Sequence, residues 1–465
     1  MPRELHGKRL IGYTLGSFGT TLINIFTELF SFQYYVYTIN LDSLVVSIGL
    51  SLNIFISALF AIIFGIMADN KKPGRLGKRR PFLLYGIPVW VVTNILIWFP
   101  PWKCPQTNSM FLPTALFFWG IIITRSVFAT LILIVYDSML PEQSQTLKNR
   151  EKIASIIGMF RIIASVVALF LPLLVQSMLD DPQNVKWWDP SGKVILTYIP
   201  IMGILFTGFS LVTVLLVYFS VDERFHEITQ DFEEKKMSLT SVIGHMALPA
   251  KDKKYRLLVI SDFIMSMGGF WGMLIFSFQT YVLNYRQSQF FIYILISIFG
   301  KLGWYILWRQ VIKKKNDNQS LLNLYIINRF IGGMVSFLVL FYFLPSISSE
   351  ASLVIYIIVF GTILGSNYSV TLFSIPINAS LIHRAAEKRD SENLEKSISE
   401  ISGIYYGFSS FMFSIGYSTS TFLVGFLLTG SNAENPVIIL ILIAARGIFV
   451  AISLVILRKL KFNEL

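Results

Sequence analysis

Ionisable side chains interrupt several long apolar runs of this chain, and they are the candidate functional residues. They are Glu28, Arg125, Arg161, Asp262, Lys301, Arg329 and Arg446, with Asp69 and Asp137 nearer the ends of their runs. A charge inside hydrocarbon costs several kcal/mol, so each is a candidate for contact with a solute or an ion. A guanidinium group binds carboxylate or phosphate through two parallel hydrogen bonds, and this chemistry would favour an anionic solute.

Depth along the runs predicts which of these charges meet. At about 1.5 Å per residue, Glu28 and Arg125 fall near the same mid-membrane depth, and we expect them to contact each other. The pair would either face the central cavity and contact a solute, or form a structural salt bridge between the two helices. A second pair, Asp137 with Arg161, falls nearer the cytoplasm, where a gating or structural role is expected.

Lys301 and Arg446 also fall near the middle of their runs. Unpaired cations there would favour a negatively charged solute such as a uronide, whereas pairing with other side chains would leave no such preference. Trp304 and Tyr406 could stack on a sugar ring, although most Trp and Tyr residues of membrane proteins pack or lie at interfaces.

Enzymatic and metal chemistry lack their usual residues. Cys104 is the single cysteine, and the four histidines are scattered without metal-ligand spacing. No nucleophile with a base and no Walker sequence occurs, because the glycines of segment 74–77 do not fit that motif. We therefore expect no catalytic residue, no metal and no cofactor.

The elements that position the charges are predicted to be membrane-spanning helices. Hydrophobic residues make up 54% of the chain and charged residues only 14%, against roughly a quarter in soluble domains. The start of the chain is polar and basic, unlike a cleaved signal. Helix alone satisfies its own backbone in lipid, so we predict an all-α protein of twelve transmembrane helices in two six-helix bundles. The spans are 10–38, 43–69, 80–100, 112–140, 152–178, 194–220, 255–284, 289–312, 319–345, 351–380, 398–428 and 434–457.

Lys and Arg alternate sharply between the connecting segments. Most lie in every second connecting segment, a set that includes both termini. The segments between these hold only Lys103, Lys186, Lys193 and Arg286. The positive-inside rule then predicts that both termini are cytoplasmic. The net charge of +12 is explained by this topology, so it does not indicate binding to nucleic acid. The charged stretch 221–254 divides an N-terminal bundle, 1–220, from a C-terminal bundle, 255–465, as a cytoplasmic loop.

Three motifs resemble those of a known family. They are Gly65-Ile-Met-Ala-Asp69 with Gly74-Arg75-Leu76-Gly77-Lys78-Arg79-Arg80-Pro81-Phe82, Tyr136-Asp137-Ser138-Met139-Leu140-Pro141-Glu142 with Arg161, and Gly403-Ile404-Tyr405-Tyr406-Gly407. The pattern resembles the major facilitator superfamily, and within it the glycoside–pentoside–hexuronide:cation symporters of the melibiose-permease type. The resemblance implies uptake of a solute, driven by sodium or protons, by alternating access at a site near mid-membrane. Gating roles would fall on Gly65, Asp69, Arg79, Arg80, Asp137 and Glu142.

The chain departs from this family at the charged positions. The acids that the family uses for cations fall near Ser57, Phe60 and Ala61, with a further one near Leu133. The family's sugar-binding aspartate falls near Thr21 and its helix-eleven lysine near Ser414, whereas the helix-five arginine survives as Arg161. We therefore do not expect cation coupling through the family's usual site. Transport would instead be coupled to a proton on Glu28, or it would not be coupled to an ion.

These observations predict a secondary transporter of the cell membrane that moves a sugar, a glycoside or a related anionic solute. The candidate solute-binding residues are Thr21, Glu28, Arg125, Arg161, Lys301, Trp304, Tyr406 and Arg446. We expect a monomer in the lipid bilayer, with a small-molecule solute and a proton or sodium as partners. A lipid or lysolipid transporter on the same fold and a non-transporting membrane sensor are the alternatives.

Overall fold

The computed structural model describes residues 4–71, 74–144, 147–222, 248–314, 317–345, 347–389, 391–392 and 394–462. Within these ranges the chain is helical, with one isolated bridge between Gly74 and Gly77. The predicted loop 221–254 lies mostly outside the described residues, and so do the side chains of Asp69 and Glu142. The division of the chain at this loop stays a prediction.

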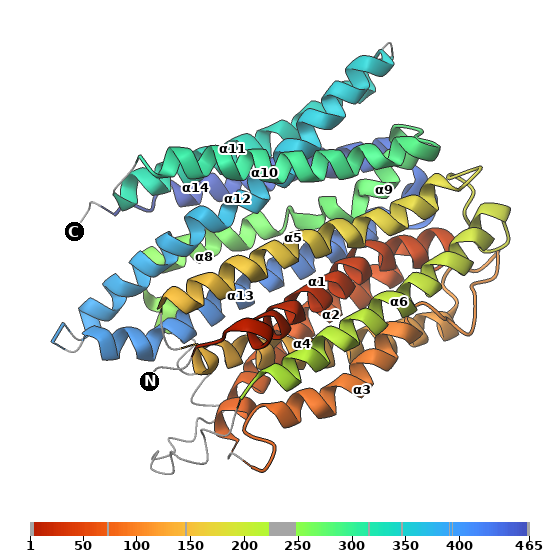
Figure 1. The fold of residues 1–465 in the computed structure, drawn as a ribbon. Coiled ribbons are helices and arrows are strands. Elements are labelled where there is room, and N and C mark those ends of the chain that lie inside the picture. The colour runs from red at the N-terminus through yellow and green to blue at the C-terminus, as the bar shows by residue number, and fades with distance from the viewer. Residues whose placement is uncertain are drawn as a thin grey trace. The chain divides into compact units, whose positions relative to one another are not determined.

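The first of two compact units contains the helices before the central segment (Figure 1). They are α1 (Gly7–Gln33), continued by a π turn η1 (Tyr34–Thr38), then α2 (Ser43–Asn70), α3 (Arg80–Leu96), α4 (Leu112–Gln143), α5 (Leu147–Ser177) and α6 (Pro190–Ser220). Local signals set several starts: the Asp42 side chain accepts a hydrogen bond from Leu44 N, and α3, α4 and α6 have proline in their first turn.

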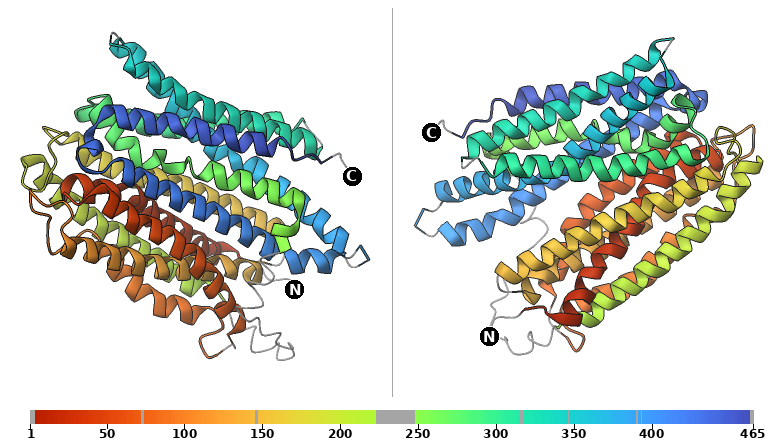
Figure 2. Two further views of the ribbon diagram at one scale, coloured as in Figure 1. Left: turned by 180° about the vertical axis from the view of Figure 1, so that it is seen from behind. Right: turned by 45° about the horizontal axis from the view of Figure 1, so that its top comes forward.

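The second unit contains the helices after the central segment. They are α8 (Lys253–Ser266), η3 (Gly269–Leu274), α9 (Ile275–Ser277), η4 (Phe278–Val282), α10 (Ile292–Ile312), α11 (Asn318–Met334), η6 (Val335–Phe343), α12 (Ser349–Arg389), α13 (Leu394–Leu427), η7 (Gly430–Glu434) and α14 (Pro436–Leu457). A 3-10 segment η5 (Gln287–Phe291) precedes α10, and all but its last residue belong to the first unit. Helix α12 has 41 residues with Pro376 inside it. Figure 2 shows it as a long helix coloured from cyan to blue.

Ten helices of the described part are long and apolar enough to cross a membrane, which confirms an all-helical, multi-pass architecture. The structure refines three predicted spans. Span 255–284 is broken after Ser266, span 319–345 continues beyond Met334 as a 3-10 helix, and span 351–380 belongs to the longer α12. Hydropathy misses such changes because a 3-10 turn is as apolar as an α-helix of the same residues.

Small residues allow close packing between helices inside each unit. A Cβ added to Gly19 of α1 would lie 1.9 Å from Thr213 Oγ1 of α6, and one added to Gly300 of α10 would lie 2.7 Å from Gly361 O of α12. Gly365 of α12 is packed as closely, because a Cβ added there would lie 2.6 Å from Gly300 O. At Gly65, by contrast, no atom of the described residues lies within 4 Å of an added Cβ.

The first span of each unit ends in the same way. The π turn Tyr34–Thr38 closes with a hydrogen bond from Ile39 N to Tyr34 O, 2.9 Å, and the π turn Phe278–Val282 with one from Leu283 N to Phe278 O, 3.0 Å. Each is followed by an asparagine at positive φ, Asn40 at 67° and Asn284 at 53°. Asparagine tolerates this left-handed conformation better than most residues. The two units therefore share a local design that the sequence shows only weakly.

Candidate functional site

A break in the first span of the second unit creates the most distinctive backbone feature of the chain. Helix α8 ends at Ser266, and the chain resumes as the 3-10 segment η3 from Gly269. A Cβ added to Gly269 would lie 2.6 Å from the Tyr417 ring, so glycine is required here for packing. Irregular backbone at membrane depth is tolerated where protein covers it or where it lines a solute path, and broken helices of this kind form binding sites in many transporters.

Arg446, near the middle of α14, lies against this break. Its side chain is almost fully buried, with 4% of the residue exposed. Its Nη1 donates to Gly268 O at 3.3 Å, and its Nη2 donates to Asn367 Oδ1 of α12 at 2.9 Å. The Trp271 ring lies beside the guanidinium, with 5.9 Å between Cζ and the ring centroid. We call Gly268, Trp271, Asn367 and Arg446 the arginine site.

The positive charge of the arginine site is not neutralised from within the described part of the chain. Amide and carbonyl oxygens hold Arg446, no described carboxylate forms an ion pair with it, and its buried Nε has no acceptor there. Lys301 of α10 is partly buried and has neither a hydrogen bond nor an ion pair with any described residue. The second unit therefore keeps two cations inside its spans that can attract an anion.

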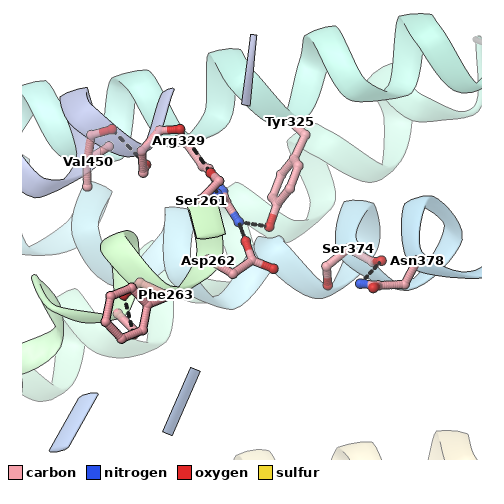
Figure 3. A network of polar contacts seen from close by, with 10 residues as sticks. Ser261, Asp262, Phe263, Tyr325, Arg329, Ser374, Asn378 and Val450 are labelled. Atoms are coloured by element: carbon pink, nitrogen blue, oxygen red, sulfur yellow. Dashed lines mark hydrogen bonds and ion pairs between the residues drawn. The ribbon is translucent and has the colours of Figure 1, made fainter. Parts of the chain in front are cut away.

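Arg329, on α11 of the same unit, is paired with a carboxylate, in contrast to Arg446 (Figure 3). Its Nη2 donates both to Asp262 Oδ1 of α8 and to the Tyr325 hydroxyl, and its Nη1 donates to Ser261 Oγ at 3.0 Å. The guanidinium also stacks over the Tyr325 ring at 4.1 Å. A carboxylate beside a buried guanidinium removes the net charge, so this network is a structural link between α8 and α11.

The first unit holds its central arginine with asparagines as well. Arg125 of α4 donates from Nε to Asn94 Oδ1 of α3 and from Nη2 to Asn24 Oδ1 of α1, each at 2.7 Å. Asn94 is fixed in turn, because its amide donates to Trp90 O at 2.7 Å. The carboxylate of Glu28, one turn after Asn24, acts electrostatically on Arg125. The predicted direct contact between Glu28 and Arg125 stays a prediction.

The second predicted pair of the first unit does form. Arg161 Nη2 lies 4.0 Å from Asp137 Oδ1, and both side chains are more than half exposed, at 51% and 61%. Nearby, Arg79 is buried, and the Arg80 guanidinium lies over the Tyr218 ring at 5.4 Å. Their gating roles stay predictions.

The structure also places the remaining predicted residues within their own units. Thr21 of α1 is partly buried, Tyr406 of α13 is exposed, and Trp304 of α10 donates from Nε1 to Asn328 Oδ1 at 2.8 Å. Gly65 lies in α2, as does the backbone of Asp69. Trp304 is therefore held by the protein's own polar groups.

Sequence reasoning missed some of the partners that define these sites. Asn94 and the Gly268 carbonyl were not anticipated, although an asparagine in the apolar run of α3 and the Gly268-Gly269 pair are both visible in the sequence. Ser57, where the family resemblance would place an acid, shares a hydrogen bond with Ser126 Oγ, which donates to Asn53 O at 2.8 Å. This neutral cluster offers a cation no carboxylate of its own.

Comparisons with known proteins agree with the helical architecture. A curated relative is the uncharacterized symporter YjmB of Bacillus subtilis (strain 168), 26% identical over 247 residues, or 52% of this chain. The matched part spans 48% of that protein, about half its length.

Solved structures share the fold at low sequence identity. The nucleoside transporter NupG has a TM-score of 0.64 at 11% identity, covering 96% of this chain and 98% of its own. A D-xylose-proton symporter has a TM-score of 0.60 at 11% identity, covering 95% and 96%. The family model described as "MFS/sugar transport protein" matches residues 12–439. Because that match takes in most of the sequence, this multi-pass membrane protein belongs to the MFS/sugar transport protein family, which comprises transporters rather than enzymes.

Proposed function

We propose that the protein is a secondary transporter that carries a sugar, a glycoside or a related anionic solute across the cell membrane by alternating access. The observation that supports this best is the arginine site: a buried, unneutralised guanidinium docked on a broken helix beside an aromatic ring. A broken span supplies backbone groups for solute binding, and a guanidinium with a free donor orients a polar ligand.

The proposal includes a topology of twelve spans with both termini in the cytoplasm. Helices α1 and α3 would join the ten apolar helices as the other two spans. The alternation of Lys and Arg between connecting segments supports this orientation. The first unit would then contribute Thr21, Glu28, Arg125 and Arg161 to the solute path.

We propose further that transport does not depend on sodium bound at the family's usual acids. The hydroxyls of Ser57 and Ser126 form a hydrogen bond with each other near that position. Neutral hydroxyls bind sodium far less well than carboxylates. A proton on Glu28 would be the alternative coupling device.

Ligand-induced thermal stabilisation of the purified protein tests the function. The panel contains neutral sugars, sugar acids and lysolipids, each with sodium or potassium at two pH values. A ligand that binds the native state raises its Tm, and we expect a shift from a sugar or a sugar acid that is equal in sodium and potassium. Stabilisation by lysolipids alone, with none by any sugar, would contradict the proposal and support a lipid transporter.

A further inference from the structure

The buried arginines of the second unit have different kinds of partner, and the difference concerns charge. Arg329 has the Asp262 carboxylate, so that pair carries no net charge. Arg446 has the Asn367 amide and a backbone carbonyl, which accept hydrogen bonds but leave the full positive charge in place. Aspartate and asparagine have nearly the same shape. Either residue could orient a guanidinium, but only aspartate would neutralise it.

An unneutralised guanidinium inside a membrane span is costly, and the cost falls when an anion binds. Arg446 meets this condition, because its partners are an amide and a carbonyl and no carboxylate of the described residues pairs with it; its Nε, like that of Arg329, has no acceptor there. Asn367 and Trp271, at the edge of the arginine site, are partly exposed, so the site is bordered by one amide and one aromatic face. An aromatic face suits the apolar face of a sugar ring, and the guanidinium suits a carboxylate.

We propose that the arginine site binds the carboxylate of a sugar acid, and that Asn367 sets this charge selectivity by orienting Arg446 without neutralising it. The inference rests on the proposed transport function and names the part of the solute that the second unit recognises. Asn367 acts through Arg446 and is therefore a positioning residue. Lys301 adds a second positive charge in the same unit.

The test compares sugar acids with uncharged amides of the same shape. The probes are D-glucuronate with D-glucuronamide, D-galacturonate with D-galacturonamide, and D-glucose as a neutral sugar. Binding is measured by the ligand-dependent Tm of the full chain in detergent. For wild type we expect at least one acid to bind about tenfold or more tightly than its amide, as charge-assisted hydrogen bonds outweigh neutral ones.

Two substitutions separate charge from shape. Asn367→Asp neutralises Arg446 from within, so we expect it to weaken acid binding about tenfold or more, to leave amide binding nearly unchanged, and to keep or raise the Tm without ligand. Asn367→Ser removes the amide but adds no charge, so the preference for the acid should persist. Asn323→Asp, at an exposed residue of α11, adds the same charge elsewhere and should change nothing.

Several results would overturn the inference. They are equal binding of acids and amides, no binding of any acid, or an acid preference that Asn367→Asp leaves intact. Uptake of D-glucose and D-glucuronate into proteoliposomes distinguishes a failure of the charge selectivity from a failure of the proposed transport function. Uptake of the neutral sugar without any preference for the acid would refute the charge selectivity alone, whereas no uptake of either sugar would count against transport itself.

Discussion

The type of hydrogen-bond partner decides what each buried arginine does. Arg329 is neutralised by Asp262 and also donates to Tyr325 and Ser261, whereas Arg446 relies on an amide and a carbonyl. The Nε of both arginines lacks an acceptor among the described residues, so the difference between the two groups is their charge: the first is neutral without a ligand and the second is not. Arg125 lies between these cases, because asparagines hold it while Glu28 acts on it at longer range.

Asp262→Asn should destabilise the protein strongly. The substitution leaves Arg329 charged and buried, which costs about 3–5 kcal/mol when one partner of a buried pair is removed. We expect a clear fall in Tm in detergent. Asp137→Asn is the control, because its pair with Arg161 is exposed and should contribute less than about 1 kcal/mol. Equal Tm values for Asp262→Asn and wild type would show that the Arg329 network is not structural.

The sequence predicted the charged members of these sites but not which residues would form hydrogen bonds with them. Arg125 and Arg446 stand out because charges are rare in apolar runs. Asn94 and Asn367 are also polar residues in such runs, but their contacts depend on how each helix is rotated about its axis, and neither residue count nor hydropathy specifies that rotation. For the same reason, depth alone could suggest that Glu28 and Arg125 meet but could not establish the contact.

At the element scale, glycine positions control how closely helices approach. Gly300 of α10 faces the Gly361 backbone of α12, so a methyl group there would collide with atoms that cannot move aside. Gly303, one turn further along α10, has no atom of the described residues within 4 Å of an added Cβ. The two glycines therefore play different roles on one helix.

Gly300→Ala should destabilise the second unit by about 1–3 kcal/mol, because overpacking forces α10 and α12 apart. Gly303→Ala should leave stability unchanged or raise it by up to about 1 kcal/mol, since alanine favours helix over glycine. Thermal unfolding of both variants in the same detergent measures the difference. A Gly300→Ala protein as stable as Gly303→Ala would contradict the close contact.

Hydropathy predicted the extent of the apolar helices well, and it failed where their geometry changes. The break at Gly268 and the 3-10 segment η6 retain apolar residues, so no loss of hydrophobicity reveals them. The glycine pair 268–269 was the available signal, and its meaning depends on Tyr417, a distant residue in the sequence. Tertiary packing, rather than local propensity, sets these features.

At the scale of the whole molecule, the family and the charges support one account. The match to the MFS/sugar transport protein family covers residues 12–439, and Ser57, Phe60 and Ala61 carry no carboxylate where the resemblance places cation-binding acids. Solute transport agrees with the family, and its independence of sodium is our proposal from these positions. The matching π turns that end α1 and α9 are typical of two units built on one plan.

Counterflow in proteoliposomes tests this account most directly. Vesicles loaded with D-glucose or D-glucuronate, with no ion gradient and no ATP, would receive the same labelled solute outside. A carrier that alternates between two faces must accumulate the label transiently, and we expect this accumulation in sodium and in potassium alike. Failure to exchange any sugar or sugar acid that binds the purified protein would show that it is not a carrier of these solutes.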